Sequence, residues 1–238
     1  MWLYRLLAPP GWEMGLTERY RRHSIRLKRY DYSQPGAYFL TICTRQKGPI
    51  LGEVSEGRMI LNALGGVVER EWLKTFLIRK TLISDEFIVM PNHFHGIIHI
   101  ADMERRGTLQ RAPREERFGK PVSNSIPTIV RLFKAVTTKQ IRILRDSPGF
   151  DLWQRGYYEH VVRNEEELNR IREYIMTNPL QWQYDRENPE AVFGKAYDDR
   201  WGPFEKDIFG RRVGARCNVP HTITADRTLS FFHGIGSR

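Results

Sequence analysis

Cysteine is scarce in this sequence, and long apolar stretches are missing. Cys43 and Cys217 are the only cysteines in 238 residues, which is too few for a disulfide framework or a four-cysteine zinc site and fits a reducing compartment. The longest stretch without a charged residue, 87–101, has fifteen residues and contains three histidines, whereas a membrane-spanning helix needs about 20 mostly apolar residues. We therefore expect no transmembrane helix.

A secretory signal is also missing from the N-terminal residues. The opening segment MWLYRLLAPPG contains one arginine and a brief apolar run that Pro9 and Pro10 interrupt. Such a run is too short to be the apolar core of a signal peptide. We therefore expect a cytoplasmic protein with no membrane partner.

The composition is that of a basic globular protein. Hydrophobic residues make up 40% of the chain and charged residues 28%, which excludes a collagen, a coiled coil and a wholly disordered chain. Lysine and arginine outnumber aspartate and glutamate by 38 to 28, so the formal net charge is +10. A positive field of this size favours polyanionic partners.

Two stretches concentrate the positive charge. Residues 19–29 contain six basic residues and no acid, with aromatic side chains interleaved, a mixture that suits phosphates and exposed bases together. The candidate nucleic-acid contacts are Arg19, Arg21, Arg22, Arg26, Lys28, Arg29 and Tyr30. Residues 105–145 contain eleven basic residues against two acids, which predicts a second basic surface. The alternative for either stretch is a charged face that is merely solvated.

Hydrophobic periodicity separates strands from helices along the chain. Runs of aromatic and β-branched residues predict strands, and apolar residues three to four apart predict helices. The predicted elements are a strand at 37–45, a helix from 64 onward, strands at 87–90 and 94–101, a helix at 126–144, a strand at 157–163 and a helix from 164 that ends before Pro179. This order, βαββαβα, predicts an α+β fold: a ferredoxin-like sandwich with helices on one face of an antiparallel sheet.

A single domain spanning residues 16–205 accounts for these elements. Residues 1–15 have neither a helical nor a strand period, and beyond about residue 205 the apolar period disappears. We therefore expect 1–15 and 206–238 to be flexible extensions, with Met14 as a candidate start. Residues 102–124 are polar and aperiodic, which predicts a mobile loop.

Two histidines on one predicted strand form a candidate metal site. Side chains alternate along a strand, so His93 and His95 share a face while Phe94 points to the core. Two imidazoles on one rigid strand can bind one metal ion, although strand histidines are more often simply hydrogen-bonded. His99 lies further along the same face. There we expect it to line a pocket or to pack against its neighbours, so we do not include it in the candidate metal site.

Other chemistries that use His-x-His motifs fail on spacing. A histidine-triad hydrolase needs a nucleophilic histidine two residues after the pair, and that position is Ile97. A two-histidine phosphoesterase needs two separate His-x-Ser/Thr motifs, which the sequence lacks. A structural zinc site needs two further histidine or cysteine ligands at close spacing, and these are also missing.

The last predicted helix carries a second candidate pair. Tyr174 and Asn178 are four residues apart and share a helix face. A phenol can act as a nucleophile that holds a phosphoryl group, and an amide oxygen is a suitable ligand for Mg²⁺ or Mn²⁺. The alternative is that Tyr174 only packs and Asn178 only caps the helix before Pro179.

Three segments in order, RYDYSQPGAYFLTICTRQK, MPNHFHGIIHI and GYYEHVVRNEEELNRIREYIMTNPLQW, closely resemble the REP-associated tyrosine transposases of the single-tyrosine HUH superfamily (IS200-like). The resemblance runs from about Arg19 to Trp182, roughly two thirds of the chain. It implies a ferredoxin-like catalytic domain in which Tyr174 is the nucleophile. It also implies that His93, His95 and Asn178 hold Mg²⁺ or Mn²⁺ and that the substrate is single-stranded DNA folded into short imperfect hairpins.

The implied activity is metal-dependent cleavage and transfer of single-stranded DNA through a 5′-phosphotyrosine intermediate, that is, DNA transposition. One alternative is a catalytically silent hairpin-binding protein or repressor, and another is a metal-dependent hydrolase of a small phosphodiester. The presence of every nominated site residue argues against the first alternative, and the basic stretches argue against the second. Tyr157 and Tyr158 are alternative candidates for the nucleophile. The sequence does not decide between a monomer and a homodimer.

Overall fold

The computed structural model describes residues 30–102, 122–185, 187–191, 202–204 and 206–208. The predicted basic segment 19–29, the basic loop around 105–120, the N-terminal extension 1–15 and nearly all of 206–238 lie outside these residues. Within the described ranges, no helix is both long enough and apolar enough to cross a membrane.

The elements follow the predicted order, with one additional hairpin. They are β1 (Gly36–Cys43), β2 (Gly52–Ser55), β3 (Arg58–Leu61), α1 (Ala63–Ile78), β4 (Leu82–Val89), β5 (His93–Ile100), α2 (Ile126–Leu144), β6 (Tyr158–Val161), α3 (Glu165–Thr177) and the 3₁₀ helix η2 (Pro179–Tyr184). The main sheet has the strand order β4-β5-β1-β6 with every neighbouring pair antiparallel. The predicted α+β class and its order of strands and helices are therefore confirmed.

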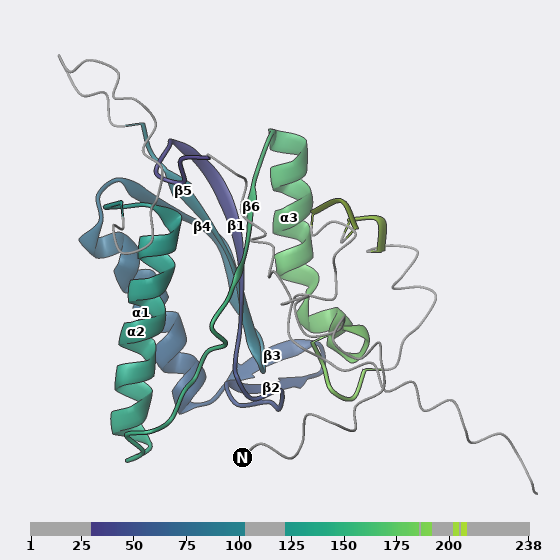
Figure 1. Ribbon diagram of the computed structural model, residues 1–238. Coiled ribbons are helices and arrows are strands. Elements are labelled where there is room, and N and C mark those ends of the chain that lie inside the picture. The colour runs from purple at the N-terminus through teal and green to yellow at the C-terminus, as the bar shows by residue number, and fades with distance from the viewer. Residues whose placement is uncertain (1–29, 103–121, 186, 192–201, 205, 209–238) are drawn as a thin grey trace, which may run out of the picture.

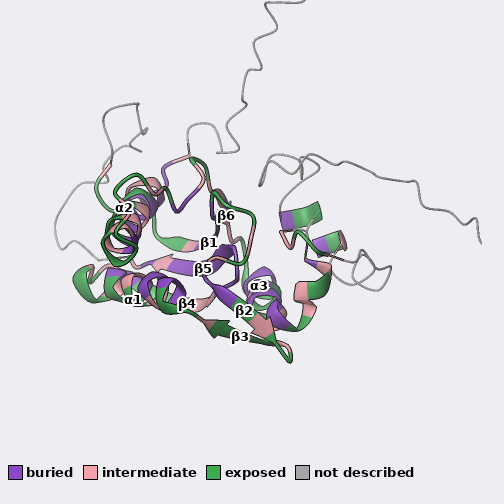
Figure 2. Cartoon of the chain, turned by 90° about the horizontal axis from the view of Figure 1, so that it is seen from below, coloured by how far each residue is buried: buried purple, intermediate pink, exposed green. Residues whose placement is uncertain are grey.

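The helices, however, lie on both faces of the sheet rather than on one (Figure 1). Helices α1 and α2 pack together on one face, against Tyr38, Leu40 and Ile42 of β1. Helix α3 packs on the opposite face, against Phe39 of β1 and Ile97 of β5. The reason is that β1 and β5 are buried at successive positions, so each strand is covered by packed elements on both sides. Figure 2 shows both strands buried between the helical layers.

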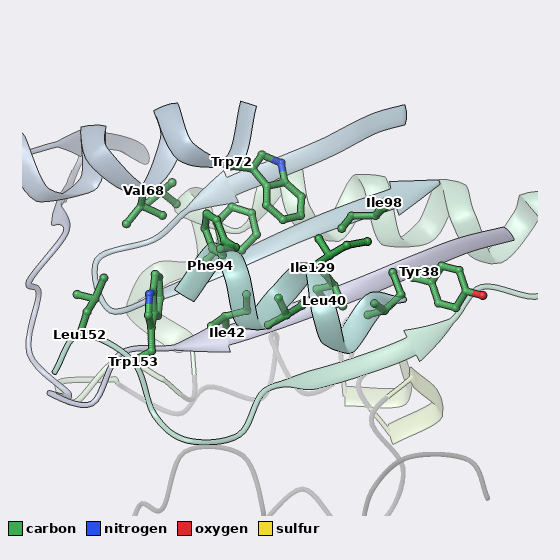
Figure 3. Close-up of a cluster of buried hydrophobic side chains, with 14 of the residues drawn as sticks. Tyr38, Leu40, Ile42, Val68, Trp72, Phe94, Ile98, Ile129, Leu152 and Trp153 are labelled. Carbon is green, nitrogen blue, oxygen red and sulfur yellow. The ribbon is translucent and has the colours of Figure 1, made fainter. Parts of the chain in front are cut away.

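The core on the α1/α2 side is built around Trp72. Its indole is fully buried, and its ring centroid lies 4.5 Å from that of Phe94 and 5.5 Å from that of Phe133. Figure 3 shows the indole of α1 lying against Phe94 of β5. This contact holds α1 directly over the strand that carries the two candidate histidines, so packing on one face of β5 fixes the position of side chains on the other.

Gly96 of β5 has no side chain, and the Trp72 ring occupies the space that a Cβ atom would need. A Cβ atom at this position would lie 2.7 Å from Cζ2 of Trp72 and 2.8 Å from the ring of Phe94. Because both rings are held in a packed core, we expect Gly96→Ala to lower the free energy of unfolding by about 1–3 kcal/mol. Gly149→Ala is the matched control, since nothing lies within 4 Å of its Cβ position. Urea denaturation of both variants tests this, and equal losses would contradict the steric explanation.

Helix α3 begins at an N-cap formed by Asn164, and Glu167 bonds back to the residue before it. The Asn164 side chain accepts the backbone N–H of Glu167 at 2.8 Å, and the Glu167 carboxylate accepts the backbone N–H of Arg163 at 2.6 Å. Glu165, Glu166 and Glu167 in the first turn also favour the positive end of the helix dipole. These contacts fix the start of the helix and therefore the positions of the side chains that follow along it.

Candidate active site

His93 and His95 lie on the face of β5 that is turned toward α3, as the alternation predicts. Phe94 between them belongs to the core on the α1/α2 side. The two imidazoles are 0% and 2% exposed, and their ring centroids are 4.6 Å apart. The strand therefore presents two adjacent buried imidazoles at the interface between the sheet and α3.

Each imidazole is oriented by a hydrogen bond with a neighbouring side chain. Nδ1 of His95 lies 2.9 Å from Oγ1 of Thr41, which is its partner across the β1–β5 ladder. Nδ1 of His93 lies 2.9 Å from Oδ1 of Asn92. The Asn92 amide nitrogen donates to the carbonyl oxygens of Lys47 and Glu187, both at 2.6 Å, which fixes its oxygen toward His93. Because that oxygen can only accept, His93 carries its proton on Nδ1 and has a lone pair on Nε2.

The lone pair of His93 faces a site without a hydrogen-bond donor. Among the described residues Nε2 is buried and has no hydrogen-bond partner. Its nearest charged neighbour is Oδ2 of Asp185 at 3.9 Å, which is too long for a hydrogen bond. Burial lowers the pKa of His93 from 6.5 to about 3, so the imidazole is neutral at physiological pH. A neutral, oriented imidazole is the form that ligates metals.

Tyr174 of α3 lies against His95. The two rings are 5.4 Å apart, and the Tyr174 ring is also 6.4 Å from Phe39 and 5.0 Å from Phe204. Tyr174 is 5% exposed. It is therefore a packed tyrosine, as one interpretation of the sequence expected, and it is packed beside one of the two candidate histidines.

Asn178 caps α3, but not through its side chain. The backbone N–H of Asn178 donates to the carbonyl of Ile175 at 3.3 Å. Its side-chain Oδ1 is buried and has no hydrogen-bond partner among the described residues. Tyr174 lies one turn before it against His95, and Trp182 follows it with a ring 6.0 Å from His93. The unsatisfied amide oxygen is thus carried by the segment that covers both histidines.

Asp185 was not foreseen from the sequence. It is buried at the end of η2, where one carboxylate oxygen accepts the N–H of Glu187 at 2.7 Å and the other lies near His93. Its approach depends on the turn that η2 makes after Pro179, and no periodicity in the sequence indicates that turn. Within the described ranges, no three histidine, cysteine or acidic side chains gather closely enough to hold a metal ion. A metal site here therefore also needs the Asn178 amide.

The two rival tyrosines point to opposite faces of β6, as expected. Tyr157 packs against the core on the α1/α2 side. Tyr158 lies on the α3 side, where its hydroxyl donates to the carbonyl of Ile208. Only Tyr158 shares a face with the histidines, and its hydroxyl is engaged with the backbone.

The C-terminal part of the described chain covers Tyr174. Phe204 and Ile208 are buried in the same cluster as Tyr174, Ile171 and Phe39. Ile208 lies beyond the predicted end of the domain at residue 205. The packed unit therefore continues at least to Ile208, because this residue completes the apolar cover of α3.

Of the candidate nucleic-acid contacts, only Tyr30 is described. Its ring lies 4.9 Å from Tyr32 and its hydroxyl 3.3 Å from that of Tyr38, at the edge of the core on the α1/α2 side. The six basic candidates that precede it, Arg19, Arg21, Arg22, Arg26, Lys28 and Arg29, lie outside the described residues.

An ion-pair network ties α3 to the sheet. Arg172, two residues before Tyr174, donates from Nε and from one terminal nitrogen to the two carboxylate oxygens of Asp85, at 2.9 and 2.7 Å. Nε2 of His99 lies 2.6 Å from the same carboxylate. His99 thus belongs to a structural network, in keeping with its exclusion from the predicted site.

We expect Asp85→Asn to lower the free energy of unfolding at pH 7 by about 1–3 kcal/mol, because Arg172 and His99 lose a charged acceptor. Burial alone would raise the pKa of Asp85, but the hydrogen bonds from Arg172 and His99 outweigh it and hold this pKa well below its ordinary value. The ionised carboxylate therefore stabilises the fold above about pH 4, and this contribution is lost as the pH falls toward the folded-state pKa.

The difference between wild type and Asp85→Asn should accordingly shrink in acid. Urea denaturation at pH 7 and pH 3 measures it. Asp151→Asn is the control, since its pair with Arg45 is exposed and such pairs contribute little. If Asp85→Asn lowers the free energy of unfolding equally at pH 7 and pH 3, the charge of the Asp85 carboxylate does not cause the stabilisation.

Comparison with known proteins finds two relatives that match most of the chain. No family model matches the chain. An uncharacterized protein of Haemophilus influenzae is 40% identical over 169 residues, which is 70% of this chain and 93% of that protein. A second Haemophilus influenzae protein, provisionally named a REP-associated tyrosine transposase, is 23% identical over 185 residues, 73% of this chain and 92% of its own length.

Two solved structures are similar at low identity. One is a REP-associated tyrosine transposase bound to a REP hairpin, with 18% identity and a TM-score of 0.46 over 67% of this chain and 74% of that one. The other is a Deinococcus radiodurans protein provisionally described as a transposase, with 18% identity and a TM-score of 0.33 over 63% of this chain and 96% of that one.

Both sequence relatives align over almost their whole lengths. The chain therefore belongs to one family with the 40% identical Haemophilus influenzae protein, and it is similar over most of its length to a protein provisionally named a REP-associated tyrosine transposase.

Proposed function

We propose that this protein is a metal-dependent endonuclease and strand transferase that acts on hairpins of single-stranded DNA, with Tyr174 as its nucleophile. One observation carries the proposal. The neutral imidazole of His93, the imidazole of His95 and the Tyr174 ring meet at one sheet–helix interface. Beside them lies the Asn178 amide oxygen, which has no hydrogen-bond partner among the residues that the structure describes. A buried amide oxygen without a partner costs stability, and a role in binding a ligand accounts for its retention.

The donor set fits Mg²⁺ or Mn²⁺. His93 would ligate through Nε2, whose lone pair is already exposed to the site, and His95 through Nε2, since Thr41 engages its Nδ1. Asn178 would add an amide oxygen, whereas Asp185 does not gather with the two histidines into a ligand set among the described residues. Mixed imidazole and oxygen ligands suit Mn²⁺ well and Mg²⁺ acceptably. Once bound, such an ion supplies charge neutralisation and orientation at the phosphate.

The chain itself supplies the nucleophile and its support. The Tyr174 oxygen attacks phosphorus, the bond from phosphorus to the 3′ oxygen breaks, and the phenolic proton is lost while the leaving oxygen gains one. The products are a 5′-phosphotyrosine and a free 3′-OH. A second 3′-OH can reverse the step and join a new strand, because the covalent bond conserves the phosphodiester linkage. Packing of Tyr174 between His95 and Phe204 restricts its ring to one position, which favours a defined line of attack.

DNA as substrate is supported by the similarity to a protein provisionally named a REP-associated tyrosine transposase and by the net charge of +10. The test is a labelled single-stranded hairpin incubated with the full-length protein and MgCl₂, with supercoiled duplex DNA as control. We expect cleavage of the hairpin and a covalent protein–DNA species. Tight binding without cleavage would instead identify a hairpin-binding protein or repressor, and hydrolysis of a small phosphodiester with no effect on the hairpin would identify a different hydrolase.

A further inference from the structure

A basic groove lies away from the candidate active site, along the second half of α2 and the loop that follows it. Its volume is about 900 Å³. Five cations line it, Arg45, Lys134, Lys139, Arg142 and Arg155, against only two acids. A concave surface lined mainly by one sign of charge concentrates the electrostatic potential and attracts ligands of the opposite sign.

The walls of this groove are held in place by their own contacts. The Lys134 ammonium donates to the carbonyl oxygens of Arg155 and Gly156 at 3.2 and 3.1 Å, and also to that of Gln154. This lysine therefore fixes the loop against α2. It leaves Lys139 and Arg155, both exposed, as cations that face solvent.

Two arginines are pre-oriented in the groove by a single carboxylate. Asp151 accepts from Arg45 at 2.6 Å and from Arg142 at 2.9 Å, and Nε of Arg142 also donates to the carbonyl of Phe150 at 2.7 Å. The side chains of Arg45 and Arg142 nonetheless stay 66% and 39% exposed. A guanidinium that is already oriented loses less conformational freedom when it binds a phosphate, and its planar shape suits two phosphate oxygens at once.

The groove meets the same end of the sheet as the candidate active site. The backbone N–H of Gln154 donates to the carbonyl of Cys43 at 3.0 Å, and Cys43 is the ladder partner of His93. The backbone N–H of Thr44, next to Arg45, donates to the carbonyl of Asn92 at 2.8 Å. The groove therefore approaches the His93 end of the sheet from the face opposite α3.

We propose that this groove binds the phosphodiester backbone of the DNA whose scissile phosphate lies at Tyr174. The proposal rests on the proposed function. Its cations contact phosphates without reading bases, so the groove supplies affinity and register rather than sequence specificity. The cations that line it all belong to the described part of the fold.

The test compares two triple variants that remove the same charge. Arg45→Gln, Lys139→Gln and Arg155→Gln remove exposed cations of the groove, whereas Arg70→Gln, Lys74→Gln and Lys80→Gln remove exposed cations that do not line it. Fluorescence anisotropy at a series of salt concentrations gives Kd for a hairpin and for an unstructured single strand. Each lost phosphate contact lowers the log–log salt slope by about 0.7–0.9. We expect the groove variant to lose about 2 from the slope and to bind ~10-fold more weakly at 0.1 M salt, with the control variant unchanged.

The outcomes separate this proposal from the proposed function. If both triple variants lose the same DNA affinity, or neither loses any, the groove is not a DNA-binding site. The proposed function is then unaffected, provided that the wild-type protein binds and cleaves the hairpin. Failure of the wild-type protein to bind either DNA overturns both proposals. If the groove variant loses affinity only for the hairpin, the groove binds the duplex stem. If it loses affinity for both DNAs, the groove binds a single strand.

A second measurement uses the unaltered protein and so does not depend on how the variants fold. DNA should protect Lys139 from acetylation by an amine-reactive reagent, as measured by mass spectrometry, and should leave Lys80 reactive. Equal modification of Lys139 with and without DNA would overturn the proposal.

Discussion

Tyr174→Phe should abolish formation of the covalent protein–DNA species while hairpin binding stays within about threefold of wild type. The substitution removes one oxygen and keeps the ring that packs against His95, Phe39 and Phe204. Since the nucleophile contributes to the chemical step and not to affinity, cleavage should fall by at least about 1,000-fold with Kd nearly unchanged. Denaturing gel electrophoresis detects the adduct, and anisotropy gives Kd.

Tyr157→Phe provides the matched control. Tyr157 immediately precedes β6 and packs against the core on the α1/α2 side, away from the histidines. Its loss should leave adduct formation unchanged. A covalent adduct mapped by mass spectrometry to Tyr158, whose hydroxyl contacts Ile208, would assign the nucleophile to a different residue and refute the role of Tyr174.

Short-range geometry explains why the histidines and Tyr174 could be located from the sequence. Strand alternation alone places His93 and His95 on one face and Phe94 on the other, and this is what β5 shows. Helical spacing likewise puts Tyr174 and Asn178 one turn apart. Both rules act over a few residues and are insensitive to the rest of the fold. Their outcome could therefore be predicted before the partners of these residues were known.

Features that depend on long-range packing were missed or wrong. The apolar stripe of α3 shows that the helix packs on a sheet but not on which face, and it lies opposite α1 and α2. The β2–β3 hairpin has strands of four residues, and its turn at Glu56-Gly57 has positive φ at both positions without the usual asparagine or aspartate signal.

The contacts that orient the site could likewise not be predicted from the sequence. Thr41 meets His95 only because β1 pairs with β5 in one register. Asp185 approaches His93 only because η2 turns the chain back after Pro179. Ile208 reaches the α3 cluster from a segment with no apolar period of its own. In each case the neighbour is chosen by tertiary structure, which a local pattern does not encode.

His93→Ala and His95→Ala should each reduce cleavage by at least about 100-fold and weaken Mn²⁺ binding to a comparable degree. His93 presents a neutral imidazole with its Nε2 lone pair directed into the site, and His95 lies beside it with Nδ1 held by Thr41. Removing either one takes away one of the two imidazole nitrogen donors at the candidate site. Ligand contacts of this kind, and even the groups that orient them, typically control 10–100-fold or more in metal affinity.

Two readouts are needed, because a lost imidazole could also disturb the buried interface with α3. Electron paramagnetic resonance of Mn²⁺ reports metal binding without any turnover, and circular dichroism reports the fold. His99→Ala is the matched control: it lies on the same strand and face but pairs with Asp85, so it should retain Mn²⁺ binding even if its stability falls. Undiminished cleavage by the His93→Ala, His95→Ala double variant in excess chelator would remove the metal from the mechanism, while leaving the prediction for Tyr174 intact.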